Sequence, residues 1–436
     1  MAVFYYMIYK TISIFLIAST FLISKGIEKN KDSLTTIEFS FVGDIMCHST
    51  QFNYSRVGAD SFDFKPVYRE IKQYFQYTDV VVGNLETVID VEGVKYSGYP
   101  VFNTTEEFID GLKFAGFNFL STANNHSFDI RERGVISTIK YIQNYGLKNI
   151  GTFVSETERD SVRIFEKNEI KYAILSYTYG VNLYNIPDES SYLVNQIDKE
   201  LIQKDITNHR IAGADIIIVF FHFGKEYSKE ANDFQKDIVQ SAIDSGADLI
   251  IGAHPHVLEP IEYFTSTSGN LGKGFVAYSL GNFVSNQRWR YSDGGAVLNF
   301  SINKNHNSGK LKLAGVRYLP IWVLKGSTEK GLEYVVLPSE VAKNKSYLTG
   351  KDKILAEECF NDTKKILTRL SGDIEIDSIS KSKHRNRMRN LKTNKFLISK
   401  IRVLDFEKQK LEILSDSLEY IKADSSIHAR ILGEIQ

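Results

Sequence analysis

Short apolar segments rich in β-branched residues recur along this chain, and they end in glycine, asparagine, aspartate or histidine. The clearest case is Leu249-Ile250-Ile251, which is followed directly by Gly252-Ala253-His254-Pro255-His256. Because the carboxyl ends of parallel strands open into one crevice of an α/β sheet, this pattern predicts that the polar residues gather there. The same kind of ending occurs at Gly43-Asp44, Gly83-Asn84, Asn124-Asn125-His126, His222 and Gly281-Asn282.

Amphipathic helices alternate with these strands, which predicts an α/β fold with buried sheets. Three later segments, 295–302, 311–324 and 332–336, resemble antiparallel strands, and the sequence from about residue 343 is charged and helical without strands. The expected strands are 37–42, 80–82, 119–121, 172–177, 215–221, 249–251 and 275–279, and the expected helices are 66–77, 106–116, 133–145 and 233–245.

The composition of the chain excludes several classes of function and of structural site. The 436 residues include 53 basic and 53 acidic ones, so no overall field attracts nucleic acid, and we expect no nucleic-acid partner. Two cysteines are too few for a disulfide framework or for a cysteine-based zinc site. Cys47 beside His48 is a poor nucleophile pair, because neighbours in an extended segment point to opposite faces.

The first segment predicts a membrane location. Residues 11–24 are almost wholly apolar, Lys10 precedes them, and lysines follow at positions 25, 29 and 31. A cleaved signal peptide and an uncleaved anchor both fit, but Ala18-Ser19-Thr20 lies inside the apolar run, which is a poor cleavage pattern. We therefore expect residues 1–35 to form a single-pass anchor in the cell membrane, with the main domain outside the cytoplasm.

The polar residues at the strand ends have the chemistry of metal ligands. Imidazole suits divalent transition metals, and carboxylate and amide oxygens complete such sites. Each residue alone has an ordinary explanation, such as Asp44 capping the next turn. Together they match the needs of a two-metal hydrolytic site with one or two Mn, Zn or Fe ions. We expect the ligand atoms to fall within one site about 10 Å across. The candidate residues are Asp44, Glu86, Asn125, His126, His222, His254 and His256.

Six motifs, in order and spacing, resemble the CapA family of poly-gamma-glutamate capsule biosynthesis proteins. The resemblance covers residues 37–338, about two-thirds of the chain. The motifs are Phe41-Val42-Gly43-Asp44-Ile45-Met46, Gly83-Asn84-Leu85-Glu86, Ala123-Asn124-Asn125-His126, His222-Phe223-Gly224-Lys225-Glu226-Tyr227, Gly252-Ala253-His254-Pro255-His256 and Tyr278-Ser279-Leu280-Gly281-Asn282-Phe283.

That family is similar to the calcineurin-like metallophosphoesterases, which implies a four-layered α/β/β/α sandwich over residues 36–342. The resemblance implies metal ligation by Asp44, Asn125, His222, His254 and His256, and it makes His126 the residue that polarises the substrate or donates a proton. Two positions depart from the pattern. Met46 stands where a histidine ligand is usual, and Asn84 stands at the bridging aspartate, so a bridging role falls to the nearest carboxylate, Glu86.

The resemblance implies a membrane-anchored protein of capsule or exopolymer biosynthesis with a metallophosphoesterase-like site. Its expected partners are an anionic polymer or a phosphoester substrate, and a membrane-bound synthase complex. Two alternatives stay open: a surface metal-dependent phosphoesterase unrelated to capsule, and a non-catalytic subunit for polymer export or assembly. Hydrolase chemistry is therefore one hypothesis among these.

The C-terminal extension, residues 343–436, lies outside the resemblance. Residues 381–402 carry nine lysines and arginines and no acidic residue. An anionic polymer or lipid headgroups could dock there, although a solvated helix face or a linker is the simpler interpretation. The helical spacing of apolar residues beyond position 403 predicts packing rather than catalysis.

Overall fold

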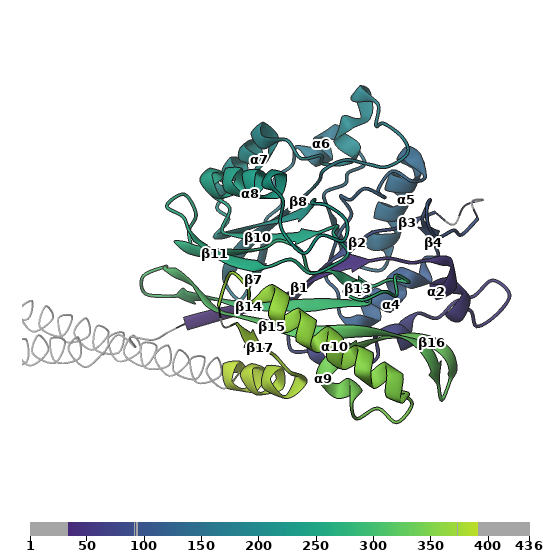
Figure 1. Cartoon of the computed structure of the whole chain (residues 1–436). Helices are drawn as coiled ribbons and strands as arrows, with labels where there is room; N and C mark the ends of the chain where they lie inside the picture. Colours follow the sequence, from purple (N-terminus) through teal and green to yellow (C-terminus); the bar gives the residue numbers. More distant parts are fainter. Residues whose placement is uncertain (1–33, 91, 93–94, 373, 391–436) are drawn as a thin grey trace, which may run out of the picture. The chain divides into compact units, whose positions relative to one another are not determined.

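A computed structural model describes residues 34–90, 92, 95–372 and 374–390 (Figure 1). The chain divides into two compact units, one ending at Lys383 and the other beginning at His384. All elements named below belong to the first unit. The predicted membrane segment and the chain beyond residue 390 lie outside the described residues. Within the part that is described, no helix combines the length and the apolar character needed to cross a bilayer.

The larger sheet has nine strands in the described part of the chain. Its strands run in the order β16-β15-β14-β1-β2-β5-β6, with β13 paired to β1 and β17 to β15. The strands from β1 to β6 along this order pair in parallel, whereas β14, β15 and β16 are antiparallel. Their bounds are β1 (Leu34–Ile45), β2 (Val80–Leu85), β5 (Phe119–Ser121), β6 (Lys148–Ile150), β13 (Asn282–Val284), β14 (Gly294–Asn305), β15 (Leu311–Thr328), β16 (Gly331–Pro338) and β17 (Glu375–Ile376).

A second sheet of six strands has the order β11-β12-β10-β9-β8-β7. Its central strands β8, β9, β10 and β12 are parallel, and its two edge strands are antiparallel. These strands are β7 (Phe165–Lys167), β8 (Ile170–Thr178), β9 (Ile216–His222), β10 (Leu249–Ala253), β11 (Ile261–Thr265) and β12 (Lys273–Ala277), and β3 (Val88–Ile89) pairs separately with β4 (Asn103–Thr104).

The helices follow the strands in the alternation expected of a mixed α/β fold, which the structure confirms. In Figure 1, α7 and α8 lie side by side above β8 and β10. The helices are α2 (Ser49–Tyr54), η1 (Lys65–Tyr68), α3 (Lys72–Phe75), α4 (Glu107–Ala115), α5 (Arg131–Asn144), α6 (Glu156–Arg159), η2 (Asp188–Leu193), α7 (Lys199–Ile211), α8 (Asp233–Ser245), α9 (Ser339–Ala342) and α10 (Gly350–Leu367).

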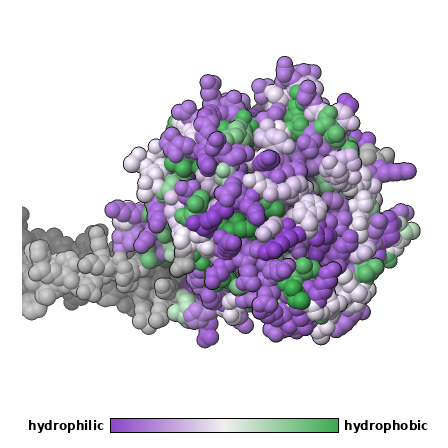
Figure 2. Space-filling model, viewed as in Figure 1, coloured by the Kyte–Doolittle hydropathy of each residue, from purple (hydrophilic) through white to green (hydrophobic). Residues whose placement is uncertain are grey.

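Buried side chains of both sheets share one apolar cluster. Phe41 of β1 stacks on Phe220 of β9, with ring centroids 6.0 Å apart, and both are fully buried. A second cluster joins the larger sheet to η1, α3, α4 and α5, and a third joins the smaller sheet to α7 and α8. On the face that Figure 2 shows, apolar side chains are scattered among hydrophilic ones. Burial in these clusters is the main stabilising term of the fold.

Two sequence-based predictions about secondary structure are wrong. The helix expected over 66–77 is two short pieces, η1 and α3, although Val67, Ile71 and Tyr74 are buried at helical spacing. Periodicity alone does not distinguish one helix from two consecutive turns that bury the same face. A strand also occurs beyond residue 343, because β17 pairs in parallel with β15 at Arg317 and Tyr318.

Candidate metal centre

The site lies where the parallel strands of the two sheets end. Asp44 of β1 pairs with Asn84 of β2 in the larger sheet, and His222 of β9 pairs with Ala253 of β10 in the smaller one. The turn after β10 then carries His254 and His256. The predicted strand-end residues therefore come from both sheets, and the structure brings them together in one buried cluster.

Asp44 contacts the histidines that follow β10. Its Oδ2 lies 3.0 Å from His256 Nδ1, and the backbone N–H of His254 donates to the same carboxylate at 3.2 Å. Asn84 Nδ2 donates to Asp44 Oδ1 at 2.8 Å. Asp44 is fully buried, so these donors replace the water that a carboxylate otherwise needs.

Glu86 is common to two groups of metal-ligand atoms. One group joins Glu86, His222 and His254, and the other joins Asp44, Glu86 and His256; within each, the atoms lie within 4.8 Å of one another. Glu86 Oε1 is 3.8 Å from Nε2 of His222 and 3.8 Å from Nε2 of His256. Glu86 could therefore contribute a ligand atom to either group.

The residues present fit divalent cations. Glu86 Oε1 and His254 Nδ1 are buried and have no hydrogen-bond partner among the described residues. Buried polar atoms almost always have a hydrogen-bond partner. A bound cation would give these two atoms the partner that they lack. Asn125 Oδ1 adjoins the first group, 2.9 Å from His222 Nε2. The donor set of imidazole, carboxylate and amide oxygen suits Mn, Zn or Fe.

Burial keeps the imidazoles of His222 and His254 neutral. Burial lowers the pKa of His222 well below its usual value and the pKa of His254 to about 3. Burial acts to raise the pKa of Asp44, but the hydrogen bond and charge of His256 outweigh it, so this pKa lies below its usual value. Burial and then the charge of Asp44 raise the pKa of Glu86. Neutral imidazole is the form that binds metals.

The turn that carries the two histidines is held in an unusual backbone conformation. His254 has φ 101° and His256 has φ 58°, values at which a side chain costs about 1–3 kcal/mol. The preceding Gly252 is packed so closely that a Cβ there would lie 1.9 Å from the carbonyl oxygen of Tyr278. Such local strain persists where the surrounding structure enforces it, and it concentrates at functional sites.

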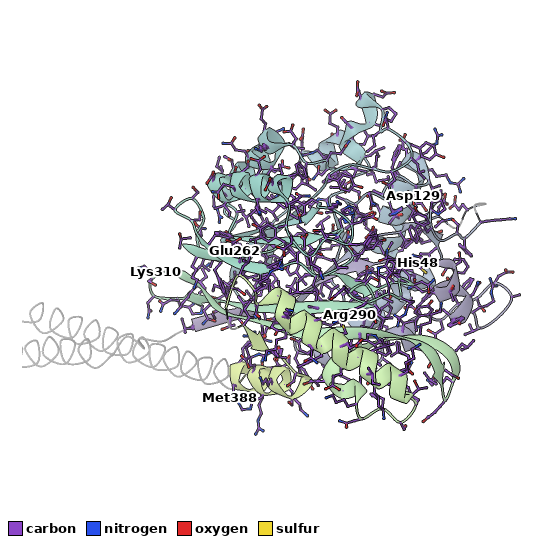
Figure 3. All side chains as sticks on the ribbon, in the orientation of Figure 1. His48, Asp129, Glu262, Arg290, Lys310 and Met388 are labelled. Carbon is purple, nitrogen blue, oxygen red and sulfur yellow. The ribbon has the colours of Figure 1, made fainter. Side chains whose placement is uncertain are left out.

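His126 lies beside the cluster rather than within it. Its Nδ1 is 2.7 Å from Asp129 Oδ2, and the same carboxylate oxygen accepts the backbone N–H of Phe102 at 2.7 Å. This arrangement orients the ring and holds a proton on Nδ1, so Nε2 remains for a ligand. His126 lines a pocket next to the cluster, and Figure 3 labels Asp129 and also His48, another residue of that pocket.

The structure also places the residues that depart from the family pattern. Met46 is buried and lines the same pocket, while Asn84 is hydrogen-bonded inside the cluster. Cys47 is fully buried, and burial raises the pKa of its thiol to about 12, so the thiol stays protonated. This agrees with setting Cys47 aside as a nucleophile.

Three neighbours of the site, Asp129, Tyr179 and Tyr227, are not among the residues predicted from the sequence. Asp129 follows His126 by three positions, a spacing that signals such a pair on one turn. Tyr179 packs on His254 with ring centroids 4.7 Å apart, and Tyr227 lies 6.0 Å from His256. Tyr227 is the last residue of the motif that begins at His222. It lies in a loop, and loop residues have no periodicity from which a place in a site could be predicted.

In sequence, the chain is similar to capsule biosynthesis proteins of bacteria. A family model, bacterial capsule synthesis protein PGA_cap, matches residues 38–287. The PGA biosynthesis protein CapA of Bacillus subtilis is 30% identical over 270 residues, which are 61% of this chain and 68% of the relative. The capsule biosynthesis protein CapA of Bacillus anthracis is 27% identical over 278 residues, 62% of this chain and 64% of that protein.

Solved structures give weaker similarities. Haemophilus influenzae NAD nucleotidase aligns with a TM-score of 0.43 and 13% identity, over 83% of this chain and 68% of its own. The calcineurin-like phosphoesterase YfkN of Bacillus subtilis aligns with a TM-score of 0.38 and 16% identity, over 76% of this chain and 98% of its own.

Proposed function

Because the chain belongs to the bacterial capsule synthesis protein PGA_cap family, we propose that it acts in the biosynthesis of a capsule or exopolymer of the poly-gamma-glutamate type. Two relatives named as CapA proteins of PGA or capsule biosynthesis support this assignment. The proposed substrate is an anionic polymer or a biosynthetic intermediate that carries a phosphoester or acyl bond.

We propose that the described residues form a four-layered α/β/β/α sandwich with the site at one end. The cluster shared by the two sheets, and the clusters that join each sheet to its own helices, support this arrangement. Asp44, Glu86, Asn125, His222, His254 and His256 would hold one or two divalent ions, which supply Lewis-acid activation of water and of the scissile group when bound.

His126 would serve as the proton-transfer residue in hydrolase-type chemistry. Asp129 Oδ2 fixes its Nδ1, so Nε2 is the atom that exchanges a proton with the substrate. The single observation that carries this proposal is the His126–Asp129 pair beside a buried group of ligand atoms that share Glu86. The pairing orients the imidazole without removing Nε2 from the pocket.

The experiment compares His126→Ala with wild type and with His306→Ala, a control in the turn between β14 and β15. Polymer at the cell surface, bound metal and hydrolysis of generic phosphoesters are measured in all three. Loss of polymer with metal content intact in His126→Ala alone supports catalysis by His126. Normal polymer in that variant, with loss only when the whole domain is deleted, would leave a non-catalytic export or assembly subunit. Normal polymer even after that deletion, with phosphoester hydrolysis lost in His126→Ala, would indicate a phosphoesterase unrelated to capsule.

We also propose that the segment before β1 anchors the protein in the cell membrane with the main domain outside, beside a membrane-bound synthase complex. The apolar run at residues 11–24 and its flanking lysines support this. Fractionation with protease protection tests it. Full-length protein in the soluble cytoplasm would contradict the proposal.

A further inference from the structure

A pocket of about 330 Å³ opens beside the candidate metal centre. His126 and His256 line it on the side of the site, and Tyr99, Tyr227 and Trp289 line it elsewhere. Its size lies in the range of small-molecule sites. A molecule held at the metal centre would therefore extend into a space bounded by aromatic rings.

These rings are exposed although large aromatic side chains are usually buried. Tyr99 is 76% exposed, Trp289 51% and Tyr227 43%. The Tyr227 and Trp289 rings lie 5.3 Å apart at an interplanar angle of 65°. Rings at this distance and angle contact each other edge to face, so Tyr227 and Trp289 form one aromatic surface along the pocket.

The position of Tyr227 is fixed before any ligand binds. Its backbone has φ 62°, its N–H donates to Pro255 O at 2.8 Å, and its hydroxyl accepts from Gln287 Nε2 at 3.3 Å. Pro255 stands between the two histidines of the candidate metal centre. A backbone hydrogen bond therefore joins Tyr227 to the turn that carries His254 and His256.

The charge in the pocket is negative. Glu226 is its carboxylate, and no lysine or arginine of the described ranges lines it. Glu226 is exposed and makes no ion pair with any side chain that the structure describes. Lys325 lies near but donates to Asn286 Oδ1 at 2.8 Å. A carboxylate with inclined aromatic faces disfavours an anion and attracts a cation.

We propose that this pocket binds an ammonium group of the substrate, while the anionic part of the same molecule faces the metal centre. The inference rests on the proposed function, because the amino terminus of a γ-linked glutamate chain carries an ammonium group and a carboxylate on one residue. The site thereby selects the amino-terminal end of the polymer rather than its interior, which has no ammonium group.

The first test examines the pocket without the polymer. Butylammonium is titrated into the full chain and followed by Trp289 fluorescence, with 1-butanol as the uncharged control and Trp289→Phe to identify the signal. Butylammonium should bind about tenfold more tightly than 1-butanol. Glu226→Gln should remove this preference. Glu166→Gln in β7, which pairs with the amino end of β8 at the opposite end from the site, should keep it.

Equal responses to butylammonium and 1-butanol, or an unchanged preference in Glu226→Gln, would overturn the inference. Thermal melts and metal content of the variants establish that the fold is retained.

The second test uses γ-linked glutamate oligomers of one length, with a free or an acetylated amino terminus, and measures binding to the Mn²⁺-loaded protein by calorimetry. The free oligomer should bind about tenfold more tightly, and Glu226→Gln should equalise the two. Equal affinity in the wild type would overturn the inference. If butylammonium binds as expected but neither oligomer does, the proposed polymer function fails while the ammonium pocket stands.

Discussion

His256 Nδ1 lies 3.0 Å from Asp44 Oδ2, although 212 positions separate the two residues in the chain. Asp44 belongs to the larger sheet, and His256 follows a strand of the smaller one. The contact therefore forms only when the two sheets come together at their shared apolar cluster. The candidate metal centre can therefore form only in the folded protein, with both sheets in place.

Glu86→Gln should separate stability from metal binding. At pH 8 without metal, the buried Glu86 opposes folding, because its pKa is raised above the unfolded value and the stability from such a group is lost as the pH rises. The variant should be more stable in chelator by roughly 1–3 kcal/mol. It should lose most of the stabilisation by Mn²⁺, which is about 2.7 kcal/mol at 100 times the dissociation constant. Thermal melts with and without Mn²⁺ check this, with Glu166→Gln as control. A full metal-induced rise in Glu86→Gln would be incompatible with a shared ligand.

Gly252→Ala should disrupt the histidine turn. The added methyl would meet the carbonyl oxygen of Tyr278 at 1.9 Å, so the backbone of β10 must move. We expect a loss of roughly 3 kcal/mol or more and reduced metal content. Gly350→Ala is the matched control, because nothing lies within 4 Å of its added Cβ. Denaturant unfolding measures both, and equal stability of the two variants would refute the close approach.

Glu259 should make the protein less stable as the pH rises. Burial raises its pKa to about 7, although the hydrogen bond from Gln235 opposes this, and its Oε1 has no partner within the described ranges. The unfolded value is 4.5. The native state therefore binds more protons between these values, so the contribution of Glu259 to stability is highest below pH 4.5 and falls as the pH rises toward 7.

In urea unfolding at pH 5 and pH 8, wild type should lose up to about 3 kcal/mol from this group. Glu259→Gln should lose correspondingly less over the same interval, and Glu166→Gln should behave as wild type. Identical pH profiles for wild type and Glu259→Gln would contradict the assignment.

Segments with regular periodicity and clear start and stop residues could be predicted from the sequence. The helix expected over 233–245 is α8, which Asn232 caps at its start and Gly246 ends with φ 103°. The strand expected over 119–121 is β5. In both segments local propensity and tertiary packing favour the same structure, and sequence patterns are reliable where they agree.

Helix α7 was missed because its inward face is partly polar. Ile202 and Ile206 are buried, but so are Asp205 and His209, which interrupt the apolar periodicity. Asp205 Oδ2 accepts from Arg159 at 2.7 Å and from Tyr177 at 2.7 Å. Burial of these polar groups depends on partners distant in sequence, which local patterns do not show.

Part of the candidate site could be predicted from the sequence, because most of its residues follow the ends of strands. Strand ends bring Asp44, Glu86, Asn125, His222 and His254 together, and the alternation of strands and helices signals that convergence. The aromatic pocket was not foreseeable. Trp289 lies in the irregular segment between β13 and β14, whose path depends on tertiary contacts rather than on periodicity.

The most direct measurement is the metal content of the full chain purified without chelator, beside the variant His254→Ala plus His256→Ala and the control His306→Ala. We predict one or two Mn, Zn or Fe ions in the wild type and in the control. The double variant should lose all or most of them, because it removes one imidazole from each ligand group that shares Glu86. A wild type without metal, or a double variant with unchanged metal content, would contradict the account.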